Sequence, residues 1–214
     1  MSAEHEAVWG SVGSPKVHDT LTDIDGDLRQ HGRYYSYVNE HGLVVGTTLS
    51  VMCVIDAPVN EVWPYYKDFN SWQSSYDHHY SGVIGDLEGQ GFSLRIADFE
   101  PIHYHVIRVI PEYLIVFNQP IPKDWPDIFP GLGLISPGFM SFGLDEYDGE
   151  THVAIFMEHA SVMARTADIA GTTVEDAIGP WRPMLTDGVR KWRDVFIPNL
   201  KELVHQGSLS LART

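Results

Sequence analysis

VIDAPVNEVWPYYKDFNSW, residues 54–72, carries the strongest local signals of secondary structure in the chain. An apolar run ends at Asp56, and Pro58 then stands where a helix would begin. Proline suits that place because its φ is preset and its missing N–H would be unpaired anyway. Apolar residues then recur at helical spacing, and Asp68 or Asn70 can open a second short turn. The stretch therefore predicts the end of a strand followed by two short helices.

Strand-like runs separated by turn residues lie on both sides of these helices. Before them, residues 43–56 form one long, mainly apolar run. After them, further runs of strand character cover residues 79–84, 92–99, 102–110, 113–119, 139–147 and 151–162. An Asp148-Gly149 turn joins the last two runs and is typical of a β-hairpin. The pattern predicts an antiparallel sheet.

The C-terminal part of the sequence has helical periodicity instead. Thr172, with Glu175 three residues later, indicates a capping box for a short helix. After Pro180, apolar residues recur on one stripe of a long helix over 181–203. We expect Pro198 to kink this helix without ending it.

This order of elements, together with the motif IDAPVNEVW at residues 55–63, resembles the START / Bet v 1-like superfamily, also called SRPBCC or helix-grip. The resemblance implies an α+β, helix-grip fold. In such a fold a curved antiparallel sheet of about seven strands wraps around a long C-terminal helix, with two short helices after strand 1. The resemblance covers residues 43–206. Residues 1–42 are then expected to be a partly ordered N-terminal extension with at most an edge strand, and residues 207–214 a tail.

The segment NQPIPKDWPDIFPGLGLISPGF, residues 118–139, departs from that plan. Its density of proline and glycine argues against a sheet or a long helix, and relatives need only a short connection here. Because it also carries many apolar residues, we interpret it as a lid-like insertion over the ligand. A loop packed on its own domain and a homodimer contact remain open.

The composition excludes several function classes. The chain of 214 residues has 14 basic and 29 acidic residues, and a formal net charge of −15. Nucleic acids and anionic membranes attract clustered lysine and arginine, so neither is an expected partner. We find no apolar run that could span a bilayer and no secretory signal at the N-terminus. The single cysteine, Cys53, fits a buried thiol in a reducing compartment, and we expect a cytoplasmic protein.

His159 is the first candidate for chemistry. Val153, Ile155 and Met157 share one face of their predicted strand, and the same parity continues to His159. A histidine at the end of an inward apolar row is either hydrogen-bonded within the core or a ligand-contacting acid/base group.

His103 and His105 are the other histidine candidates. They share one face of the predicted strand 102–110, but apolar residues occur on both faces, so the pattern leaves the inward face open. Two histidines at this spacing could ligate a metal ion if a third group joined them. We expect no metal and no cofactor.

The leading hypothesis is a binding module for a hydrophobic or aromatic small molecule, held between the sheet and the C-terminal helix. The superfamily also implies an alternative, a cofactor-independent cyclase or dehydratase of the polyketide cyclase/aromatase kind, with His159, His103 or His105 as acid/base groups. A protein-interaction domain like the chaperone-activating branch is a third reading. The candidate ligand-binding residues share an expected inward position: Trp63, Phe92, Leu94, Ile96, Phe117, Trp125, Met140, Phe142, Ile155, Met157, Trp181, Leu185, Val189 and Trp192.

Overall fold

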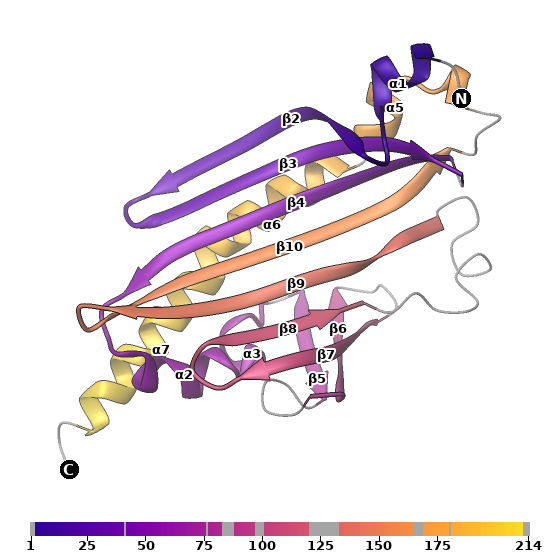
Figure 1. Ribbon diagram of the computed structural model, residues 1–214. Helices are drawn as coiled ribbons and strands as arrows, with labels where there is room; N and C mark the ends of the chain where they lie inside the picture. The colour runs from indigo at the N-terminus through magenta and orange to yellow at the C-terminus, as the bar shows by residue number, and fades with distance from the viewer. Residues whose placement is uncertain are drawn as a thin grey trace.

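A curved sheet and a long C-terminal helix dominate the computed structural model (Figure 1). The structure describes residues 3–40, 42–75, 77–82, 88–96, 101–119, 133–164, 169–179 and 181–211. The 10-stranded sheet has the order β1-β2-β3-β4-β10-β9-β8-β7-β6-β5, with every consecutive pair antiparallel. The α+β fold class, with the sheet curved around the last helix, is confirmed.

The elements have the following bounds. The strands are β1 (Gly10–Ser11), β2 (Ser14–Asp25), β3 (Leu28–Asn39), β4 (Gly42–Ile55), β5 (His78–Gly82), β6 (Gly91–Ile96), β7 (Ile102–Ile110), β8 (Leu114–Asn118), β9 (Gly133–Tyr147) and β10 (Glu150–Ala164). The helices are α1 (Ala3–Trp9), α2 (Val59–Tyr66), α3 (Phe69–Trp72), η1 (Ile169–Gly171), α5 (Val174–Ile178), α6 (Trp181–Lys191), the π-helix η2 (Trp192–Phe196) and α7 (Ile197–Leu211).

The N-terminal segment contributes more to the sheet than its sequence indicates. Residues 10–39, expected as an extension with at most an edge strand, form β1, β2 and β3, and β3 pairs along its length with β4. The inward positions of β3 include Gln30, Gly32 and Ser36, all buried. Polar and small residues at these positions hide the alternation of apolar residues by which a strand is recognised. The sequence therefore predicts only about seven strands, whereas the sheet has 10.

The second half of the proline-rich insertion is also sheet. β9 begins at Gly133. Pro137 lies between Ser136 and Phe139, which pair with Ala160 and Glu158 of β10, and the register shifts at this point. A bulge accommodates proline because the ladder lacks a hydrogen bond at that point. Residues 120–132, which hold the rest of the predicted lid, lie outside the described residues.

One continuous helical segment runs from α6 through η2 to α7, across the face of the sheet behind β3, β4 and β10 (Figure 1). Pro198 lies in the first turn of α7, so the predicted interruption takes the form of the π-helical turn just before it. A proline cannot donate to the carbonyl of residue 194 and clashes with it, and a widened turn relieves both problems. The short helix α5 has the predicted kind of cap one residue later, formed by Thr173 and Asp176.

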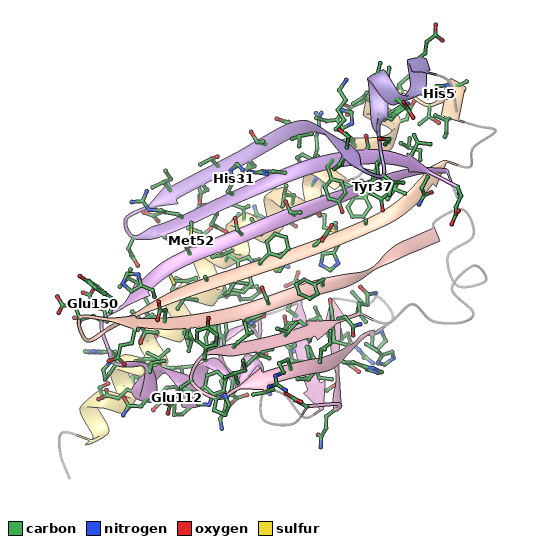
Figure 2. The ribbon with its side chains drawn as sticks, in the orientation of Figure 1. His5, His31, Tyr37, Met52, Glu112 and Glu150 are labelled. Atoms are coloured by element: carbon green, nitrogen blue, oxygen red, sulfur yellow. The ribbon has the colours of Figure 1, made fainter. Side chains whose placement is uncertain are left out.

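The two faces of the sheet differ in character. His31, Tyr37 and Met52 lie on the face of β3 and β4 that looks away from α6 (Figure 2). The opposite face carries the core. It is rich in aromatic rings, with Phe69 of α3 and Phe142 of β9 at its centre, 4.7 Å apart. This core fills the space between β6–β9, the short helices and η2.

Candidate functional site

The inward face of β10 changes from buried to partly accessible along the strand. Val153 and Ile155 are each 2% exposed, whereas Met157 and His159, farther along the same face, are only half-buried. The cause is the position of α6, which packs on β3 and β4. Leu185 of α6 sits directly over Gly32, where a Cβ atom would lie 2.8 Å from Leu185 Cδ2. The inner face of β10 near His159 is therefore not sealed by the helix.

Thr47, Gly138 and Gln119 lie around the His159 side chain. Thr47 of β4 is its register partner and is buried. On the other side, Gly138 of β9 leaves room for the imidazole, because a Cβ there would lie 2.7 Å from His159 Nδ1. The same Cβ would lie 3.0 Å from Oε1 of Gln119, a buried residue that follows β8. We define the His159 site as His159, Thr47, Gln119, Gly138 and Met157.

Burial lowers the pKa of His159 to about 4. The imidazole is therefore neutral near neutral pH, with one nitrogen as a donor and the other as an acceptor. Such a group can orient a polar atom of a ligand or accept a proton from it.

Replacing His159 is expected to change how stability depends on pH. In the unfolded chain His159 binds a proton below about pH 6.5, whereas in the folded chain it does so only near pH 4. Stability contributed by neutral His159 is thus complete above pH 6.5 and falls between about pH 6.5 and pH 4. Wild type should lose about 2 kcal/mol more than His159→Gln over this interval in urea titrations. Equal losses in both proteins would contradict the assignment.

Most of the predicted ligand-binding residues come together in one core. The following are at most 9% exposed and belong to the same cluster: Trp63, Phe92, Leu94, Phe117, Met140, Phe142, Ile155, Trp181, Leu185, Val189 and Trp192. Met157 packs against this cluster and keeps partial access. Trp125 and the side chain of Ile96 lie outside the described residues. Within this set, Met157 and Met140 come nearest to the accessible part of the inner face.

The structure does not bring His103 and His105 into the His159 site. Both are exposed on the outer face of β7, and His103 Nδ1 lies 2.8 Å from Ser93 Oγ of β6. Tyr104 and Val106 occupy the inward positions, at 2% and 1% exposure. The sequence could not settle this because a register shift after Val106 places apolar residues on both faces of β7. Among the described residues, no group of three His, Cys, Asp or Glu side chains could hold a metal ion.

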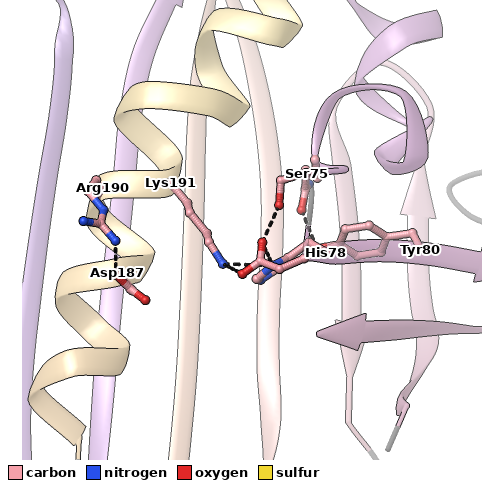
Figure 3. Close-up of polar contacts among 8 residues, drawn as sticks. Ser75, His78, Tyr80, Asp187, Arg190 and Lys191 are labelled. Carbon is pink, nitrogen blue, oxygen red and sulfur yellow. Dashed lines mark hydrogen bonds and ion pairs between the residues drawn. The ribbon is translucent and has the colours of Figure 1, made fainter. Parts of the chain in front are cut away.

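A second polar cluster joins the edge strand β5 to α6 (Figure 3). Lys191 Nζ lies 2.6 Å from Asp77 Oδ2 and 3.0 Å from His78 Nδ1. Asp77 Oδ1 accepts a hydrogen bond from Ser75 Oγ at 2.8 Å and lies 3.0 Å from His78 Nδ1. We call Ser75, Asp77, His78 and Lys191 the β5–α6 cluster. The His78 side chain is 14% exposed.

The charges of the β5–α6 cluster compensate one another. Burial alone would raise the pKa of Asp77, but hydrogen bonds from Lys191, Ser75 and His78 outweigh it and hold the pKa well below its usual range. Burial lowers the pKa of His78; Lys191 adds to this effect and Asp77 opposes it. The cluster is therefore a neutral assembly of a carboxylate, an ammonium group and an uncharged imidazole.

Comparison with known proteins supports the fold. No family model matches the sequence, and no curated protein matches it. A solved protein of unknown function from Staphylococcus aureus is similar in structure, with a TM-score of 0.55 and 7% identity, over 77% of this chain and 96% of that chain. A protein from Nitrosomonas europaea has a TM-score of 0.49 and 16% identity, over 76% of this chain and 96% of that one. A protein of the dynemicin biosynthetic locus has a TM-score of 0.43 and 16% identity, over 74% of this chain and 47% of that chain.

The similarity to the Staphylococcus aureus protein concerns the fold alone. Within the described part of the chain, no helix is long and apolar enough to cross a membrane.

Proposed function

We propose that the protein binds an apolar or aromatic small molecule between the inner face of the sheet and α6. The observation that carries this proposal is the transition along β10, where an inward row that is sealed at Ile155 becomes accessible at Met157 and His159. An accessible concave face lined by apolar side chains and a few polar groups is typical of small-molecule sites. The resemblance of the sequence to the START / Bet v 1-like superfamily supports the same function.

The His159 site supplies both kinds of contact that such a ligand needs. Met157 and Met140 are flexible apolar side chains that adapt to the shape of a ligand. His159 and Gln119 can exchange hydrogen bonds with a polar substituent and so fix its orientation. Burial of apolar ligand surface supplies affinity, at about 25 cal/mol per Å² before the costs of association.

The first test asks whether the purified protein carries a ligand. Native mass spectrometry should show a bound apolar compound, and denaturing extraction should identify it. A protein that is empty and gives no thermal shift with a panel of aromatic and lipid compounds would contradict the proposal.

A steric block tests where the ligand lies. Met157→Trp places a larger side chain on the accessible inner face and is expected to weaken binding of the extracted compound at least tenfold, measured by calorimetry. Ala154→Trp is the matched control, because Ala154 lies on the exposed outer face of the same strand. Equal affinity of the two variants would exclude this location.

A further inference from the structure

A buried amide after α3 has an unused hydrogen-bond donor. Gln73, the residue that ends α3, is 2% exposed. Its Oε1 accepts a hydrogen bond from the Tyr80 hydroxyl at 2.8 Å. Its Nε2 has no hydrogen-bond partner among the residues that the structure describes. A buried N–H group without a partner is unfavourable, so each such group in a folded protein needs an explanation.

The surroundings of this donor are aromatic. The ring of Tyr80 lies 6.1 Å from Phe69 and 6.1 Å from Phe92, measured between centroids. Phe92 in turn contacts Phe117 at 5.0 Å, so Tyr80, whose hydroxyl bonds the Gln73 amide, packs at the margin of the core that holds most of the predicted ligand-binding residues. Tyr80 itself is only half-buried, which leaves the inward face of β5 partly accessible.

The charges of Lys191 and Asp77 beside β5 cancel. His78 and Tyr80 share the inward face of β5, and beside them Lys191 reaches across from α6 to Asp77 (Figure 3). Because Asp77 neutralises Lys191, this edge of the sheet offers no net positive charge to attract a carboxylate. The free donor of Gln73 is therefore suited to an uncharged acceptor oxygen.

We infer that Gln73 is a ligand-contacting residue whose Nε2 donates a hydrogen bond to a ketone-type oxygen on an aromatic ligand. Tyr80 is its positioning residue, since the Tyr80 hydroxyl holds the amide oxygen and turns the N–H group away from itself. The inference rests on the proposed binding function and adds a chemical class to it. Aromatic ketones should bind better than the matching hydrocarbons.

Matched ligand pairs test this preference. Calorimetric titrations would compare tetralone with tetralin, and anthrone with dihydroanthracene, on wild type and on Gln73→Leu. Wild type should bind each ketone about tenfold more tightly than its hydrocarbon, as one hydrogen bond allows. Gln73→Leu should bind both members of a pair equally, with the hydrocarbon affinity retained. Gln206→Leu, the same change at an exposed position of α7, should behave like wild type.

A second variant distinguishes a ligand contact of Gln73 from a purely structural effect of its replacement. Tyr80→Phe leaves Gln73 in place but removes the hydroxyl that orients it. This variant should reduce the preference for ketone over hydrocarbon from about tenfold to about threefold. A wild type that binds both members of each pair equally, or a Gln73→Leu variant that keeps the preference, would overturn the inference while leaving the binding function intact. A wild type that binds none of the four compounds would count against both.

Discussion

Phe142→Ala is expected to lower the free energy of unfolding by about 4 kcal/mol. Phe142 is 1% exposed and lies where β9 faces the short helices and η2. Among the residues that the structure describes, its ring has five aromatic neighbours, with centroids between 4.7 and 6.4 Å away: Tyr66, Phe69, Trp72, Phe117 and Trp192. The substitution removes apolar contacts on all sides and leaves a cavity that rigid rings close poorly.

The matched control for this change lies on the neighbouring strand. Phe156 of β10 is half-buried on the outer face, and Phe156→Ala should cost about 1 kcal/mol in urea denaturation. The cavity left by Phe142→Ala should also accept benzene, which would raise the melting temperature of the variant and leave wild type unchanged. A loss below about 1.5 kcal/mol, or no response to benzene, would show that the core collapses around the missing ring.

The parts of the fold that the sequence predicts are those with strong local signals. The IDAPVNEVW motif and the residues after it become β4, α2 and α3, because proline and helical periodicity act within a few residues. The strand predicted over 102–110 is β7, bounded by turn residues on both sides. The sequence does not predict β3, because its inward positions are partly polar and only its pairing with β4 along the whole strand defines it. The sequence does not predict β2 either, because its position in the sheet depends on pairing with β3.

The site shows the same division. Strand parity was sufficient to place His159 on the inner face, because β10 alternates regularly from Val153 to Met157. Gly138 and Gln119 could not be found, since they approach His159 from other strands beside a bulge. The β5–α6 cluster also cannot be predicted from the sequence, because Lys191 and Asp77 are 114 residues apart and neither belongs to a recognisable sequence motif.

Lys191→Met is expected to destabilise the protein by about 3 kcal/mol. Its side chain is 13% exposed and its partner Asp77 is 18% exposed, so the pair is shielded from water on most sides. Removing the ammonium group leaves the Asp77 carboxylate without its cation while Ser75 still holds it in place. Breaking a buried ion pair from one side costs more than the pair itself contributes, because the remaining charge cannot regain its hydration.

A double-mutant cycle separates this effect from lost packing. Asp77→Asn combined with Lys191→Met removes both charges and should recover about 2 kcal/mol of the loss measured by urea denaturation. Arg190→Met is the control on the adjacent position, where the Arg190–Asp187 pair is 63% and 57% exposed and should contribute less than about 0.5 kcal/mol. The variant Lys191→Met should also exchange the amide protons of β5 faster, since the cluster joins this edge strand to α6. Destabilisation without faster exchange in β5 would instead place the loss in α6 and η2, at the start of the π-helical turn.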